Sequence, residues 1–179
     1  MNLSTDLIKR YTAEKLSARE AQRLAEFIAW GPAIFQVSRL MVKFGILDLL
    51  RDSSDGLTRQ DLVEHTSLSD YAMKCLLEAS LSIGIVLVNP QTEKYTISKT
   101  GWFLLNDPAT RVNMDFNHDV NYEGWFHLEE SLLNGKPEGL KHLEVGSPSM
   151  RDYPACLNKY SKAGSGSTIF IATHPFRKP

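Results

Sequence analysis

The pair most suggestive of chemistry in this sequence is His127 with Glu130. The two residues stand three positions apart, so on a helix both side chains would lie on one face and could chelate a metal ion. Two ligands without further partners are more typical of a solvated helix face. We therefore expect no metal ion here.

The two cysteines, Cys75 and Cys156, carry little chemistry. No basic residue stands near Cys75 at helical spacing, so we expect a small core residue rather than a nucleophile. Two cysteines form no disulfide framework and no zinc-ligand cluster, which favours a reducing cytoplasm. The opening residues 1–6 lack the pattern of a signal peptide, and no apolar stretch reaches the roughly 20 residues of a membrane span.

Charge divides the chain into two parts. Residues 1–146 hold 15 lysines and arginines against 20 aspartates and glutamates, whereas residues 147–179 hold five against one. The length of 179 residues suits one domain, or one domain and a fragment of a second. The larger part is acidic, which disfavours a nucleic-acid partner.

Helical patterns fill the first 52 residues. One amphipathic helix is expected to begin near Ser4 or Thr5, and a capping box at Ser17 and Glu20 predicts the start of another. Pro32 suits the first turn of the next helix. From residue 33 to residue 51, apolar residues recur at helical spacing and predict one long helix, buried on more than one side: Ile34, Val37, Met41, Val42, Phe44, Ile46, Leu47, Leu50.

Residues 57–101 show the order of a winged helix-turn-helix. Thr58 should cap a short helix, and Ser69 a longer one that Gly84 ends. A hairpin with arms 85–88 and 95–97 would form the wing. The residues expected to point inward from the longer helix are Tyr71, Ala72, Cys75, Leu76, Ala79 and Ile83.

More helices should follow the wing, one near residues 100–105 and two beyond Arg111. The clearer of these is residues 121–134, with Trp125, Leu128 and Leu132 on one face. The fold class predicted is therefore mainly α: a winged helix-turn-helix with additional N- and C-terminal helices and a small β-hairpin wing.

A winged helix either binds DNA or joins subunits. Its second helix here carries only one base, Lys74, against Asp70 and Glu78, whereas DNA binding depends on neutralising phosphates. The apolar surface of residues 24–50 is wider than one small winged unit can cover, and a homodimer would bury it. We favour the homodimer, with a winged-helix DNA-binding transcriptional regulator as the alternative.

Several short runs resemble one family in their order and spacing. They are Ala33–Leu40 (AIFQVSRL), Phe44–Leu50 (FGILDLL), Gly56–Thr58, Leu76–Ser80 (LLEAS) and Tyr95–Gly101 (YTISKTG). From residue 25 to residue 146 the chain resembles the N-terminal winged-helix dimerisation domain of S-adenosylmethionine-dependent small-molecule O-methyltransferases. In that family this domain swaps helices across the dimer and lends residues to the substrate pocket.

The resemblance implies two sets of site residues. The first should lie in a homodimer interface: Phe27, Ile34, Phe35 and Met41. The second should line a pocket for a small-molecule acceptor: His118, Tyr122, Trp125 and Phe126. Without the resemblance, the simpler interpretation is that the aromatic side chains of this segment are buried on the inner face of a helix.

The family's catalytic domain has no counterpart in these residues. A methyl-donor site needs a strand leading into a glycine-rich turn, but Gly164–Thr168 (GSGST) precedes a strand-like run instead. His174 does not match the family's catalytic histidine. We therefore expect no catalytic or cofactor-binding residue in this chain, and no activity from it alone. S-adenosylmethionine would be the cofactor of the full-length relative.

The tail, residues 147–179, does not resemble the family, and a reading-frame shift would explain its change of charge and its lost periodicity. With suitable codons, residues 149–176 read in a neighbouring frame can spell HEGLSRLSEQVQQSWFGFDHFYSDTSF. That string resembles the family's linker into the methyl-donor domain. We divide the chain into a winged-helix dimerisation domain, 1–146, and a frame-shifted, poorly ordered tail. The alternative is a natural basic tail that is disordered.

Overall fold

A side-chain cap begins the first described helix, and a proline lies in the first turn of the second. The computed structural model describes residues 13–142, so the helix expected near Ser4 and the tail lie outside the described residues. Helix α2 (Ala18–Ala29) begins at the predicted capping box: the hydroxyl of Ser17 accepts a hydrogen bond from the Glu20 amide, and the Glu20 carboxylate accepts one from Ser17. Helix α3 (Gly31–Lys43) follows directly, with Pro32 in its first turn.

The single long helix expected from residue 33 to residue 51 is wrong. The chain forms α3 and a separate helix α4 (Ile46–Asp52), because Gly45 takes a left-handed conformation with φ of 71°. Glycine adopts this conformation without a steric penalty. The turn lays α4 back against α3, so that Ile46, Leu47 and Leu50 are all buried.

The two helices of the winged unit begin where the sequence predicts. Thr58 caps α5 (Arg59–Glu64) through a capping box with Asp61, and Ser69 caps α6 (Asp70–Ile83). Gly84 ends α6 with φ of 83°, the left-handed terminator expected there.

A two-stranded antiparallel sheet forms the wing. Strand β1 (Val86–Val88) pairs with β2 (Tyr95–Ile97) in the register Val86 to Ile97 and Val88 to Tyr95. An isolated bridge from Leu57 to Tyr95 ties the wing to the start of α5. The mainly helical fold with a small hairpin is therefore confirmed.

The face of α6 that enters the core matches the prediction only in part: Leu76 and Ile83 pack against the core, but Tyr71 and Cys75 do not. Met73, Leu77 and Ser80 are fully buried, whereas Tyr71 is 76% exposed and Cys75 is exposed. Cys75 is thus not the core residue expected. Apolar side chains stand on both sides of this helix, so their spacing alone does not select one face.

One apolar core joins α3, α4, α5, α6, β1 and the two helices that follow the wing. Helix α7 (Lys99–Asn106) begins at Ser98, whose hydroxyl donates to the Gly84 carbonyl at 2.7 Å. Helix α8 (Pro108–Phe116) begins at Asp107. The buried apolar residues are Met41, Val42, Ile46, Leu47, Leu50, Leu62, Met73, Leu77, Ile85, Val86, Leu105 and Met114.

Beyond α8, residues 117–142 form four short helical segments. They are a π-helix η1 (Asn117–Asn121), a 3₁₀ helix η2 (Gly124–His127), α9 (Leu128–Asn134) and a 3₁₀ helix η3 (Glu138–His142). The continuous helix expected over 121–134 is therefore wrong. Gly124 and Gly139 lie so close that a side chain on Gly139 would meet the Gly124 carbonyl, and this contact joins η2 to η3.

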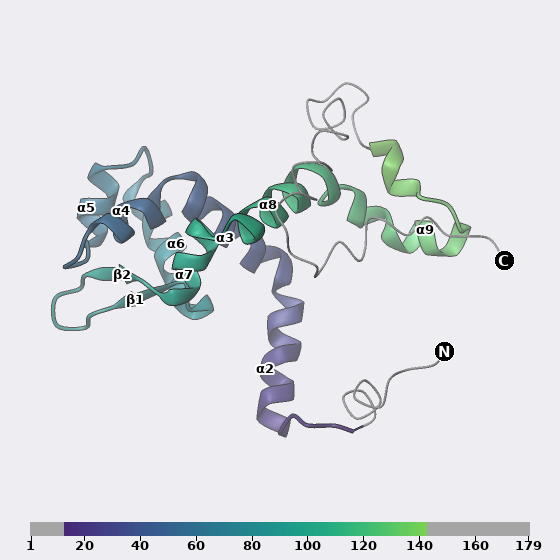
Figure 1. The fold of residues 1–179 in the computed structure, drawn as a ribbon, viewed down its shortest axis with the longest axis horizontal. Helices are drawn as coiled ribbons and strands as arrows, with labels where there is room; N and C mark the ends of the chain where they lie inside the picture. Colours follow the sequence, from purple (N-terminus) through teal and green to yellow (C-terminus); the bar gives the residue numbers. More distant parts are fainter. Residues whose placement is uncertain (1–12, 143–179) are drawn as a thin grey trace.

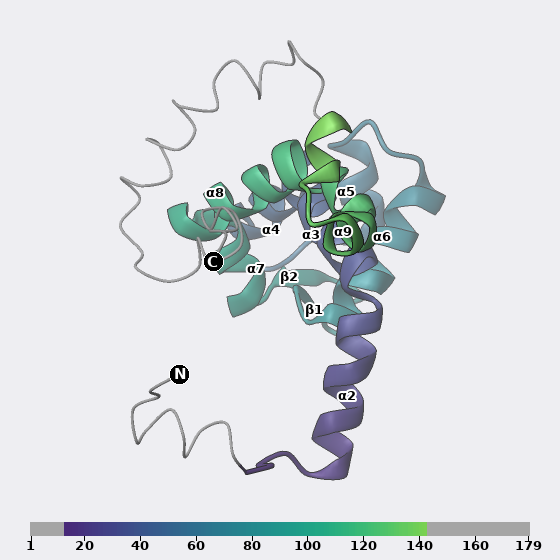
Figure 2. The ribbon, with the colours of Figure 1, turned by 90° about the vertical axis from the view of Figure 1, so that its right-hand side faces the viewer.

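Two arms extend from the winged unit. Figure 1 shows α2 projecting from the junction with α3, while η1 to α9 continue α8 away from the wing. Figure 2, turned by 90°, shows α2 again standing clear of the other helices. Helices α2, η2 and α9 hold no buried residue. Within residues 13–142, no helix combines the length and apolar character needed to cross a membrane.

Candidate functional site

The structure brings three of the four predicted pocket residues together around one tyrosine. The Tyr122 ring stacks on Phe35 with ring centroids 5.4 Å apart, and His118 and Phe126 lie 6.3 and 6.4 Å from it. The Tyr122 hydroxyl donates to the Pro32 carbonyl at 3.2 Å, which fixes the ring against the start of α3. We call Phe35, His118, Tyr122 and Phe126 the aromatic cluster.

The aromatic cluster is covered on one side only. Phe35 is half-buried on α3, while Phe126 is 81% exposed and the neighbouring Trp125 is 42% exposed. Such an open set of rings can take a planar apolar group by stacking or edge-to-face contact. Its chemistry suits binding and orientation of a ligand.

His118 is the polar member of the aromatic cluster. Its Nδ1 is buried, with no hydrogen-bond partner among the described residues. Burial lowers the pKa of His118 below its usual value of 6.5, and the charges of Arg39 and Lys43 lower it further, against opposing effects of Asp119 and Asp115. The ring is therefore neutral at pH 7 and carries one unfilled hydrogen-bonding position.

The residues predicted to lie in an interface fall into three environments. Phe27 on α2 is 55% exposed, whereas Ile34 and Phe35 are half-buried on α3. Met41 is 0% exposed, because α4 and α6 cover its side of α3. Met41 therefore lies inside its own chain and does not face a partner in this conformation.

Large apolar side chains are left uncovered on α2 and on the segment from η2 to η3. We call these two sets the uncovered apolar faces. Residues of this size are normally buried, and contiguous exposed patches mark interaction sites. Their exposed fractions range from 42% to 81%: Leu24, Phe27, Ile28, Trp30, Trp125, Phe126, Leu128, Leu132, Leu133 and Leu140.

The second winged helix has a surface poorly suited to DNA. Its base, Lys74, lies 3.8 Å from Glu78, and Asp70 lies 2.7 Å from Arg59 of α5. Each cation that could approach a phosphate here is already beside a carboxylate. The geometry gives no support to specific DNA binding through α6.

The two residues considered as metal ligands, His127 and Glu130, do lie close together. His127 Nδ1 lies 3.6 Å from Glu130 Oε2 on the exposed face of η2 and α9. Within residues 13–142, no three histidine, cysteine, aspartate or glutamate residues converge as a metal site would require.

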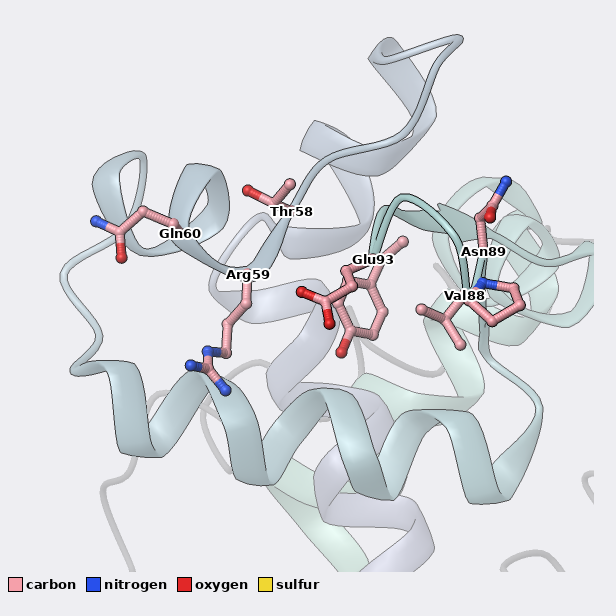
Figure 3. A pocket seen from close by; sticks show the side chains of 8 residues that line it. Thr58, Arg59, Gln60, Val88, Asn89 and Glu93 are labelled. Carbon is pink, nitrogen blue, oxygen red and sulfur yellow. The ribbon is translucent and has the colours of Figure 1, made fainter.

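A cavity of about 560 Å³ lies between the start of α5 and the wing, and the sequence did not indicate it. Figure 3 shows Glu93 extending from the hairpin loop toward Arg59 across this space. Two of its polar side chains already have partners: Arg59 lies beside Asp70, and Thr58 donates to Asp61. We therefore place the candidate site at the aromatic cluster and the uncovered apolar faces.

The fold is that of a mainly helical, winged-helix-like domain with uncovered apolar faces. Residues 22–95 match the family model described as the Dimerisation2-like domain. The chain matches no curated protein in sequence.

Solved structures share the fold. The S-adenosylmethionine-dependent methyltransferase SibL is 18% identical with a TM-score of 0.63, covering 76% of this chain and 42% of its own. Human N-acetylserotonin methyltransferase is 20% identical with a TM-score of 0.59, covering 84% and 46%. A structure described as a pericyclic reaction enzyme is 14% identical with a TM-score of 0.63, covering 95% and 45%. The chain thus spans less than half the length of these neighbours.

Proposed function

We propose that this chain is the homodimerisation and substrate-pocket domain of an S-adenosylmethionine-dependent O-methyltransferase. One observation supports the dimer above all: α2, η2 and α9 carry large apolar side chains and yet hold no buried residue. A second copy would cover these faces symmetrically, as in an isologous dimer. The proposed interface includes Phe27, Ile34 and Phe35.

The aromatic cluster and Trp125 would contribute one wall of a pocket for a small aromatic acceptor. The stacked pair of Phe35 and Tyr122 provides a rigid apolar surface, and His118 provides a neutral hydrogen-bonding group beside it. We propose that residues 1–179 bind no methyl donor by themselves, and that S-adenosylmethionine is the cofactor of the longer relatives. We also propose a cytoplasmic location, in keeping with the free, exposed Cys75.

The chain as purified should be a dimer that does not bind S-adenosylmethionine. Sedimentation equilibrium at tens of micromolar is expected to give twice the monomer mass of 20.2 kDa, since interfaces of this kind commonly reach micromolar affinity or better. Titration calorimetry of the same sample with the methyl donor should show no saturable heat.

A monomer at these concentrations would contradict the proposed homodimer. Saturable micromolar binding of the methyl donor would contradict the proposal that this chain alone does not bind it. A sequence-dependent shift on DNA duplexes at physiological salt would restore the transcriptional regulator.

The division into a domain, residues 1–146, and a frame-shifted tail, residues 147–179, is a proposal about the gene. Sequencing across codon 147 should reveal a neighbouring frame that stays open downstream and encodes a strand followed by a glycine-rich turn. The opposite result, a neighbouring frame closed by stop codons, would leave the tail native.

A further inference from the structure

Three cations converge on a cavity that the proposed dimer and the aromatic cluster do not use. Arg39 and Lys43 come from α3, one helical turn apart, and Arg111 comes from α8. With Val42, Met114 and Asp115 they line a space of about 190 Å³. Val42 and Met114 are buried and form its apolar base. The lining therefore carries three positive charges against the single carboxylate of Asp115.

The three cations have no carboxylate partner within residues 13–142. Among the described residues, neither Arg39, Lys43 nor Arg111 takes part in an ion pair, although Asp115 stands one turn beyond Arg111 on the same helix. The Nε of Arg111 is buried and has no acceptor in that part of the chain. A buried donor of a charged group without an acceptor is costly, so the site is incomplete as it stands.

The neighbouring histidine responds to the same charges. His118 has a lowered pKa, first because of burial and then because of Arg39 and Lys43, while Asp119 and Asp115 act in the opposite direction. A dianion would balance the net charge of the cavity lining.

We propose that the cavity between α3 and α8 binds a small oxyanion, a phosphate or a carboxylate group, through Arg39, Lys43 and Arg111. Guanidinium and ammonium groups are the side chains that bind these anions most strongly. The cavity is smaller than the 300 Å³ or so of typical drug-sized ligand sites, but it is ample for one oxyanion and a few waters. Because the three cations surround a recessed space, we favour a small anion over an acidic side chain of a second copy.

Inorganic phosphate is the first probe, titrated into the full chain at constant ionic strength with chloride as the reference ion. The amide signals of residues 39–43 and 111–118 should shift saturably, with a dissociation constant on the order of 1 mM for so small a ligand. Acetate should bind more weakly because it carries a single charge. Bound phosphate should also raise the pKa of His118, followed by NMR, because it offsets Arg39 and Lys43.

Substitutions distinguish a specific anion-binding site from nonspecific attraction between phosphate and a positively charged surface. Arg39→Gln and Lys43→Gln should each weaken phosphate binding about tenfold, whereas Asp115→Asn should strengthen it severalfold. Arg59→Gln is the matched control, since Arg59 is also a half-buried arginine but lies outside the cavity. It should leave phosphate affinity unchanged.

The absence of saturable shifts would overturn the proposal, as would an equal loss of affinity in Arg59→Gln. It would also be overturned if Arg39→Gln and Lys43→Gln weakened self-association while phosphate affinity stayed the same. The cations would then serve a partner chain. Thermal unfolding of each variant, followed by circular dichroism, keeps these outcomes distinct from loss of fold.

Discussion

Phe27→Glu is expected to convert the dimer into a folded monomer. Phe27 projects from α2 with 55% of its surface exposed, so the monomer does not depend on its burial. At an interface, a charge in place of this ring would have to be buried without a partner, which commonly costs about 2–4 kcal/mol at a central position. The dimer dissociation constant should therefore rise on the order of 30- to 1,000-fold in sedimentation equilibrium.

Leu87→Glu provides the matched control for this change. Leu87 is 57% exposed, but it lies on β1 in the wing, away from the uncovered apolar faces. The control should leave the dimer intact and the unfolding temperature nearly unchanged. If Leu87→Glu dissociated the dimer and Phe27→Glu did not, the interface would lie on the wing instead of α2.

Local signals in the sequence predicted the ends of most elements correctly. Ser17, Thr58 and Ser69 cap helices because their hydroxyl groups accept from amides that have no partner within the helix. Gly84 ends α6 because it adopts a positive φ readily. These interactions join residues two to four positions apart, so a short window of sequence contains all that is needed.

Two errors arise because apolar residues recur on more than one side of a helix. Gly45 ends the first part of the predicted long helix. Apolar residues continue at helical spacing before and after Gly45, so the sequence pattern does not reveal this break. In α6 the sequence pattern placed Tyr71 on the inward face, but Tyr71 is exposed and Met73 is buried. A hydrophobic pattern shows that a helix is amphipathic. When apolar residues stand on both sides, the elements packed around the helix determine which side is buried.

The candidate site was predictable only in part. The resemblance pointed to His118, Tyr122 and Phe126, which the structure brings together around Tyr122. The cations Arg39 and Arg111 have no such signal, because they are far apart in the sequence and meet only when α8 returns toward α3. A site of this kind can be recognised only when the structure shows which charged residues lie together.

Met41→Ala is the substitution that tests the division between core and interface. Met41 is 0% exposed in the core, so truncation should leave a cavity and lower the free energy of unfolding by about 2–5 kcal/mol. Met41→Leu, which roughly conserves volume, should cost less than about 1.5 kcal/mol. Denaturant unfolding followed by circular dichroism measures both.

The decisive comparison is made in the monomeric background of Phe27→Glu. A core residue stabilises its own chain, so Met41→Ala should cost the same in the monomer as in the dimer. An interface residue contributes only when the partner is bound, and its effect would vanish in the monomer and depend on protein concentration in the dimer. Loss of the Met41→Ala penalty in the Phe27→Glu background would place Met41 in the interface after all. A penalty that persists there would show that Met41 packs in the core of its own chain, on the side of α3 that α4 and α6 cover.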